Sequence, residues 1–156
     1  MKSLILYTSK YGSTKKIVDY MADQLCADSI NLIDNTQINL SSYDQVIIGG
    51  AIYYGSIHNL ISSFIEDNQD ELLTKNIALF LVCMLSEETA AEQFNNNFSD
   101  KLLSHSVADG FFGGILMKEQ LNSVEKLVTS FTFKNAGTFD QLYFDEVDKF
   151  VAEIKI

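Results

Sequence analysis

The chain has 156 residues, 47% of them hydrophobic, which suits one domain over residues 1–156 with a substantial core and no linker between two halves. Its formal net charge of −10 argues against nucleic-acid partners and anionic membrane surfaces, whereas a basic docking partner fits it. No apolar run approaches the roughly 20 residues of a membrane-spanning helix, and Lys2 and Ser3 lead straight into an apolar run without a signal peptide. We therefore expect a cytoplasmic protein.

The cysteines and the basic residues exclude several kinds of functional site. Cys26 and Cys83 lie far apart in apolar surroundings and form neither a C-x-x-C motif nor zinc-ligand spacing, so we expect reduced thiols in the core. The chain has lysines but no arginine, which removes bidentate guanidinium chemistry from any mechanism. The sequence predicts no metal site.

Apolar periodicity in the first half predicts strands that alternate with helices. Continuous apolar runs over residues 2–7 and 45–52 are typical of strands covered on both faces, whereas residues 30–33 are short enough for an edge strand. Hydrophobic residues recur at helical spacing over residues 14–27 and 59–73, with charged residues between them. Both of these segments are therefore expected to be amphipathic helices on a sheet.

The second half continues the alternation until its last quarter. Residues 77–84 predict a fourth buried strand, residues 89–102 a helix that opens with capping-box spacing, and residues 107–116 a fifth strand softened by glycines. Residues 118–131 predict an additional amphipathic helix, a mixed segment follows, and a last helix begins at about Asp145. This order predicts a parallel sheet with helices on both faces, whose ligands bind at the carboxyl ends of the strands.

The turn from Ser9 to Thr14 lies between the first strand and the first helix. The unpaired N–H groups and the dipole of a helix N-terminus can bind a phosphate, hydroxyl side chains add donors, and Gly12 allows a tight turn. The same composition is typical of an ordinary N-cap, in which Ser13 or Thr14 satisfies the amides of the first turn. From the residues alone, both interpretations stay open.

Two further loops follow strands whose carboxyl ends lie at the same edge of the predicted sheet. The segment from Ala51 to His58 carries Tyr53 and Tyr54 before a glycine, and a planar apolar ligand stacked on a tyrosine explains such a loop. The alternative is that one tyrosine packs on the core while the other is merely exposed. Residues 83–88 form the third loop at this edge.

In combination and order, these motifs resemble those of flavodoxin-like proteins, whose phosphate loop follows the pattern S/T-x-T-G-x-T. Ser9, Gly12 and Thr14 match this pattern. Lys10 and Tyr11 depart from it. The departures point to a particular branch of these proteins.

That branch includes the menaquinone-dependent protoporphyrinogen oxidases, which the run GGAIYYG at residues 49–55 and the extra helix after the fifth strand also resemble. The resemblance covers almost the whole chain. It implies a flavodoxin-like three-layer α/β sandwich, with a five-stranded parallel sheet of order 2-1-3-4-5, helices on both faces and an extra helix inserted after strand 5.

The resemblance implies an FMN site built from the three loops, with Tyr54 as the residue that stacks on the isoalloxazine ring. Lys15 and Lys16 would add positive charge near the phosphate, although both are more simply read as solvated helix residues. No catalytic residue is assigned. The implied cofactor-binding residues are Ser9, Lys10, Tyr11, Gly12, Ser13, Thr14, Ala51, Ile52, Tyr53, Tyr54, Gly55, Ser56, Cys83, Met84, Leu85 and Ser86.

The function implied first is that of an FMN-dependent electron-transfer flavoprotein or oxidoreductase, whose partner is a redox protein or a quinone. A second possibility is a quinone-linked oxidoreductase of the protoporphyrinogen oxidase type, but the acidic charge and the mixed charges of residues 117–142 suit a carboxylate-bearing porphyrinogen poorly. A flavodoxin-fold binding module without flavin is the non-redox alternative. The sequence leaves the oligomeric state open.

Overall fold

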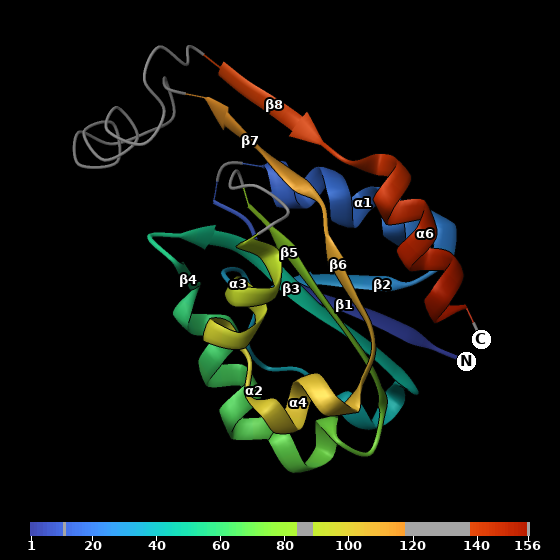
Figure 1. The fold of residues 1–156 in the computed structure, drawn as a ribbon. Helices are drawn as coiled ribbons and strands as arrows, with labels where there is room; N and C mark the ends of the chain where they lie inside the picture. Colours follow the sequence, from blue (N-terminus) through green and yellow to red (C-terminus); the bar gives the residue numbers. More distant parts are fainter. Residues whose placement is uncertain (11, 84–88, 118–137, 156) are drawn as a thin grey trace.

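The computed structural model describes residues 1–10, 12–83, 89–117 and 138–155. Figure 1 shows its helices and strands in the order of the colour bar, from the blue N-terminus to the red C-terminus. The elements are β1 Ser3–Thr8, α1 Ser13–Leu25, β2 Asp28–Asn31, the 3₁₀ helix η1 Leu40–Ser42, β3 Gln45–Tyr53, β4 Ser56–Ile57, α2 Asn59–Leu72, β5 Asn76–Val82, α3 Ala90–Asn97, α4 Asp100–His105, β6 Ser106–Phe111, β7 Gly113–Met117, β8 Thr138–Leu142 and α6 Phe144–Ile154.

Five parallel strands form the main sheet in the order β2-β1-β3-β5-β6, which confirms the expected order of 2-1-3-4-5. The short strand β4 adds to β3 in the antiparallel direction. Helices α1 and α6 cover one face of the sheet, and α2, α3 and α4 cover the other (Figure 1). The expected three-layer sandwich is therefore confirmed.

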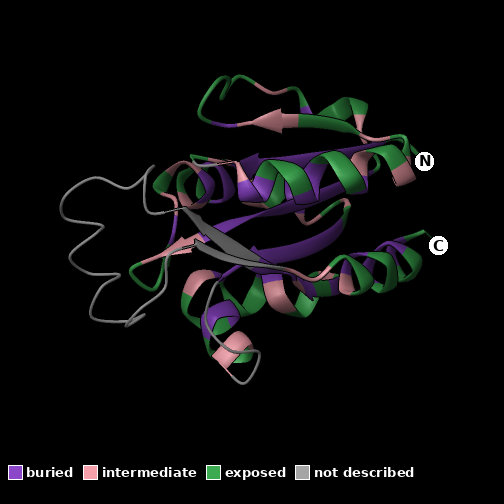
Figure 2. Ribbon diagram, turned by 90° about the horizontal axis from the view of Figure 1, so that it is seen from above, coloured by how far each residue is buried: buried purple, intermediate pink, exposed green. Residues whose placement is uncertain are grey.

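The apolar strands supply two cores, because successive residues of a strand point to opposite faces of the sheet. In β3, Val46 and Ile48 belong to the core under α2, whereas Ile47 belongs to the core under α1 and α6. All three side chains are completely buried. Figure 2 shows the buried strands between helices whose outer faces are exposed, the arrangement that a continuous apolar run predicts.

The sheet is tightly packed at Gly49 of β3, which pairs with Phe80 of β5. A Cβ atom at position 49 would lie 2.2 Å from the carbonyl oxygen of Phe80 and 2.5 Å from its Cγ. The Phe80 ring is completely buried and stacks on Phe112, with 5.8 Å between the ring centroids. Packing against the neighbouring strand therefore requires glycine at this position.

The structure corrects the fifth strand, which was expected to run over residues 107–116. After β6, the completely buried Phe112 packs edge-on against Phe150 at 5.4 Å between centroids, and Gly113 adopts a φ of 71°. β7 then pairs with β8 in a separate two-stranded antiparallel sheet, which Figure 1 shows projecting from one end of the main sheet. The left-handed backbone at the glycine breaks the strand, and the mixed segment expected around β8 contains a strand that was missed.

The helix expected over residues 89–102 is in fact two helices. The backbone is extended at Phe98, and Ser99 caps α4 by accepting a hydrogen bond from the N–H of Leu102 at 3.3 Å. Ala91, which was expected on the buried stripe, is exposed. A serine that can begin a new helix therefore interrupts a pattern whose apolar spacing is continuous.

The other helices agree with their expected positions to within about two residues, as boundaries of this kind usually do. The helix expected over residues 118–131 lies outside the described residues. In the described part of the chain, no helix combines the length and the apolar character that crossing a membrane requires.

The two cysteines differ in their surroundings. Cys83 is buried, as expected, with 4% of its surface exposed. Cys26 was also expected in the core, but it is exposed at the C-cap of α1, with a left-handed φ of 50°. The end of the helix turns this side chain outward, and neither cysteine forms a disulfide bond.

Candidate functional site

The carboxyl ends of β1, β3 and β5 lie side by side, which brings the three predicted loops together. Thr8 at the end of β1 pairs with Gly50 of β3, and Gly50 pairs with Leu81 of β5. One residue further along, Ala51 pairs with Val82. β2 lies on one side of β1 in the sheet, and the later strands β3, β5 and β6 lie on its other side, so the strand order reverses at β1. Parallel α/β sheets bind ligands at the carboxyl edge beside such a reversal.

The first loop leads into an α1 N-terminus that has no side-chain cap. The N-cap is Gly12, with a φ of 91°, and its own N–H donates to Ser9 Oγ at 3.2 Å. Ser13 and Thr14 lie within the helix and are buried, so neither has the capping role that was the alternative interpretation. A Cβ atom at Gly12 would meet nothing within 4 Å. The Gly12 position is therefore open, directly before a helix start that has no side-chain cap.

Of the lysines near this loop, Lys15 has an acidic partner on the same helix. Lys15 donates to Asp19 at 2.6 Å across one turn of α1, and this hydrogen bond raises the pKa of the lysine. Lys16 and Lys10 are exposed. Because Lys15 already has an acidic partner, its charge is partly offset before any anion binds. Beneath them, burial raises the pKa of Tyr7, the penultimate residue of β1.

The second loop is shorter than expected, because most of it belongs to a hairpin. Ala51, Ile52 and Tyr53 continue β3, and Tyr53 pairs with Ser56 of β4. Tyr54 and Gly55 connect the strands with φ values of 54° and 79°, as the two central residues of a type I′ turn require.

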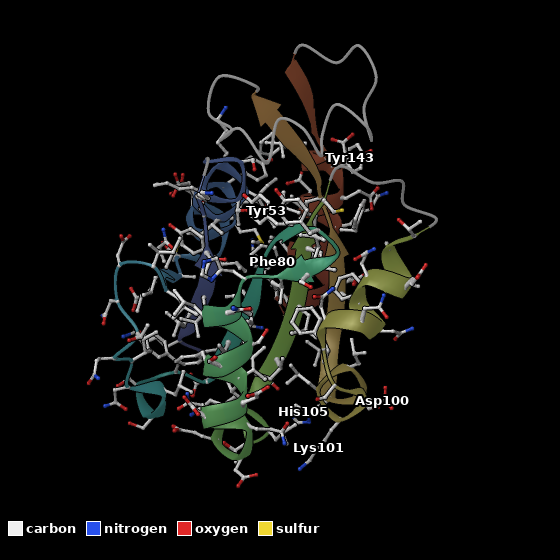
Figure 3. The ribbon with its side chains drawn as sticks, turned by 90° about the vertical axis from the view of Figure 1, so that its left-hand side faces the viewer. Tyr53, Phe80, Asp100, Lys101, His105 and Tyr143 are labelled. Atoms are coloured by element: carbon white, nitrogen blue, oxygen red, sulfur yellow. The ribbon has the colours of Figure 1, made fainter. Side chains whose placement is uncertain are left out.

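The two tyrosines have different environments. Tyr53 is partly buried against the core under α1 and α6, and Figure 3 shows it at the opposite end of the sheet from His105. Tyr54 is 63% exposed and is one of two described non-glycine residues with a positive φ. A bulky residue in this conformation costs about 1–2 kcal/mol. The turn therefore keeps an exposed aromatic ring in a strained position at the carboxyl edge, an outlier that points to function.

The third loop begins at Cys83, whose buried position directly follows β5. The other residues predicted for it, Met84, Leu85 and Ser86, lie outside the described residues, as does Tyr11 of the first loop. Their part in a site remains a prediction.

Asn97 is a contact of the second loop that the sequence analysis missed. It lies at the end of α3, and its side chain bonds to both Gly55 and Ile57. Asn97 stands in a run of three asparagines, and nothing local distinguishes it from its neighbours. His58, by contrast, is the N-cap of α2, where its Nδ1 accepts from the N–H of Leu60 at 3.1 Å.

His105 lies far from this edge, at the end of α4, where its Nε2 is 2.9 Å from the carbonyl oxygen of Lys75. In the described ranges, no group of three or more His, Cys, Asp or Glu residues is arranged to hold a metal ion. The chemistry that the described residues support at the carboxyl edge is therefore anion binding by amides and stacking on an aromatic ring.

The chain is similar in sequence to two proteins with the same name. It is 26% identical over 147 residues to the protoporphyrinogen IX dehydrogenase [quinone] of Leishmania major, a match that covers 87% of this chain and 64% of that protein. It is 29% identical over 113 residues to the protein of the same name from Escherichia coli strain K12, covering 68% and 62%. The matches thus span less than two thirds of the length of these relatives.

Solved structures show the same fold. The oxidised Flavodoxin 2 of Bacillus cereus matches with a TM-score of 0.54 and 23% identity, covering 73% of this chain and 82% of that one. The Fusobacterium nucleatum flavodoxin bound to flavin mononucleotide matches with a TM-score of 0.52 and 16% identity, covering 70% and 69%. The sequence model of the flavodoxin domain matches residues 4–141, and the chain belongs to the flavodoxin domain family.

Proposed function

We propose that this protein binds FMN at the carboxyl edge of its sheet and acts as an FMN-dependent electron-transfer protein or oxidoreductase. The observation that carries the proposal is the uncapped N-terminus of α1 at the same edge as the exposed, strained Tyr54. The first can bind a phosphate and the second can stack on a flat ring. A flavodoxin of the same fold is bound to flavin mononucleotide, which supports this assignment.

The phosphate end of FMN fits the first loop. The Gly12 position has open space around it, and the amides at the start of α1 have no side-chain cap, so a dianionic phosphate would find donors and a favourable helix dipole. The six residues proposed to hold it are Ser9, Lys10, Tyr11, Gly12, Ser13 and Thr14.

The flat end of FMN fits the second and third loops. Tyr54 would cover one face of the ring and the segment from Cys83 to Ser86 the other, with the rest of the hairpin from Ala51 to Ser56 beside them. When bound, FMN would supply the electron transfer, which no protein side chain provides by itself. The acidic chain, with its net charge of −10, penalises additional negative charge at this edge and so favours a low reduction potential.

Replacing Tyr54 by asparagine is expected to change stability and binding in opposite directions. Asn-Gly is a preferred pair for a type I′ turn, so the free energy of unfolding of the apoprotein should rise by about 1 kcal/mol. The affinity for FMN should fall roughly tenfold, because the stacking ring is lost. Thermal unfolding and FMN titration measure the two effects.

Tyr54→Phe is the matched control, because it keeps both the ring and the strained conformation. It should retain the affinity of the wild type. An asparagine variant that binds FMN as tightly as Tyr54→Phe would contradict the stacking role.

A quinone-linked oxidoreductase that acts on protoporphyrinogen is the second candidate function. It is supported by the two relatives named protoporphyrinogen IX dehydrogenase [quinone]. The matches cover 64% and 62% of those proteins, and we propose their activity for this chain on that basis.

Two measurements made in sequence test the two candidates. We expect FMN titrated into the purified protein to saturate at equimolar flavin with a shifted visible absorbance spectrum, and a protein that takes up no FMN would contradict both candidates. The FMN-loaded protein is then incubated anaerobically with protoporphyrinogen and a soluble quinone. Turnover supports the second candidate, whereas FMN binding without turnover leaves the electron carrier.

A further inference from the structure

We propose that Asn97 is the positioning residue that fixes the Tyr54–Gly55 turn, so that α3 determines how Tyr54 meets the flavin ring. This inference rests on the proposed FMN function and extends it to a residue about 40 positions away in the sequence, outside the three predicted loops.

The side chain of Asn97 uses both of its polar atoms on the hairpin. Its Oδ1 accepts from the N–H of Ile57 at 2.8 Å, and its Nδ2 donates to the carbonyl oxygen of Gly55 at 3.3 Å. The same Nδ2 donates to the carbonyl oxygen of Gln93 at 2.8 Å, one turn earlier in α3. One amide therefore ties the turn, the strand after it and the helix together.

The strand pairing of the hairpin is short in the part of the chain that the structure describes. β4 has two residues, and its ladder consists of the pairs Ile52 with Ile57 and Tyr53 with Ser56. A short two-stranded hairpin is marginal without further packing. The buried Ile57 anchors the end of the hairpin, but its N–H needs the partner that Asn97 provides.

The strain at Tyr54 makes this support necessary. A tyrosine at a φ of 54° would relax to a right-handed or extended conformation if its surroundings allowed it. Strained residues persist where neighbouring contacts over-determine them. The bond to the Gly55 carbonyl restrains the Gly55–Ser56 peptide, which directly follows the two central residues of the turn, and so limits how far Tyr54 and its ring can move.

The buried face of α3 is also more polar than packing alone requires. Gln93 lies one turn before Asn97 on the same side of the helix and is 8% exposed. Its Oε1 is buried without a hydrogen-bond partner in the described part of the chain. A helix that only covered the sheet would place apolar residues here, so the polar residues on this face indicate a role besides packing.

The test is a double-mutant cycle between Asn97→Ala and Tyr54→Asn, measured by FMN affinity and by quenching of flavin fluorescence. Asn97→Ala in the wild type should weaken FMN binding roughly tenfold and reduce the quenching that depends on Tyr54, the effect expected when a hydrogen bond that orders the ring is lost. In the Tyr54→Asn background the same change should have no effect, because there is no ring to position.

Two further variants separate positioning from folding. Asn96→Ala removes an exposed neighbour and should bind FMN like the wild type. Asn97→Asp keeps an acceptor for the N–H of Ile57 but loses the donor to Gly55, so its amide exchange at Ile57 should stay slow while the quenching falls.

The outcomes distinguish the inference from the proposed function. A wild type that binds no FMN contradicts the proposed function and the role of Asn97 in it. A wild type that binds FMN contradicts the inference alone if Asn97→Ala leaves affinity and quenching unchanged, or weakens binding equally in the two Tyr54 backgrounds. An Asn97→Ala variant that is unfolded is replaced in the cycle by Asn97→Asp, for which the same expectations and contradictions hold.

Discussion

Replacing Gly49 by alanine is expected to lower the free energy of unfolding by about 3 kcal/mol, the upper part of the usual range for overpacking. The added methyl group would lie 2.2 Å from the carbonyl oxygen of Phe80, a backbone atom in a central strand that cannot move without disturbing the ladder. For a chain of 156 residues this corresponds to a fall of roughly 10 °C in the midpoint of thermal unfolding. Calorimetry of the apoprotein measures it.

Gly50→Ala is the matched control, since it adds the same methyl group to the next residue of the same strand. There the nearest atom is the hydroxyl oxygen of Thr8 at 3.1 Å, which can rotate away. The loss of stability should be much smaller, below about 1 kcal/mol. Equal losses for the two variants would mean that the contact with Phe80 does not set the spacing of these strands.

Gly12→Asp is expected to weaken FMN binding on the order of a hundredfold, because it places a carboxylate beside the proposed phosphate position. The φ of 91° at this position strains any side chain, but aspartate tolerates a positive φ better than most residues and would point into open space, so the fold should survive. A negative charge near a helix N-terminus favours the helix by about 0.5 kcal/mol, so the apoprotein should be slightly stabilised by the charge itself. Titration with FMN and thermal unfolding of the apoprotein measure the two effects.

Gly12→Asn isolates the charge, because asparagine has the same shape as aspartate and tolerates a positive φ equally well. Relative to this variant, Gly12→Asp should bind FMN more weakly and unfold at a higher temperature. The difference in affinity should shrink as salt is added. If the two variants bind FMN equally, the phosphate does not lie at the N-terminus of α1.

The order of the main sheet could be predicted from the sequence because burial on both faces leaves a clear pattern. Residues 45–52 contain no charge, and the structure buries Val46, Ile47 and Ile48 completely between two helical layers. The carboxyl edge then follows from chain direction alone, which is why the sequence is enough to group the three loops.

The breaks within apolar runs could not be predicted in the same way. Phe112 and Gly113 lead from Phe111 of β6 straight into the apolar residues of β7, and the break becomes visible only in the packing of Phe112 against Phe150 and in the positive φ of the glycine. At Ser99 a signal was present, since serine is a preferred N-cap, but the continuous apolar spacing outweighed it.

In the candidate site, too, local sequence patterns do not predict every feature. The Tyr54–Gly55 pair carried a turn signal in its glycine, whereas the left-handed conformation of Tyr54 depends on the register of β3 with β4. The contact of Asn97 with this turn joins residues 40 and 42 positions apart, and no local pattern encodes such a pair. Loops that lie next to each other can be predicted from topology, but the side chains that hold them require coordinates.

Because the two cysteines differ in exposure, a fluorescent label can be placed away from the proposed site to report the binding of cofactor and partner. Cys26 is exposed while Cys83 is buried, so a maleimide dye should attach selectively to Cys26 in the folded protein. α1 begins at the proposed phosphate position and ends at this cysteine, and its 13 residues span roughly 20 Å at 1.5 Å per residue. A dye there would be close enough for energy transfer with the flavin, yet one helix length away from the loops that hold it.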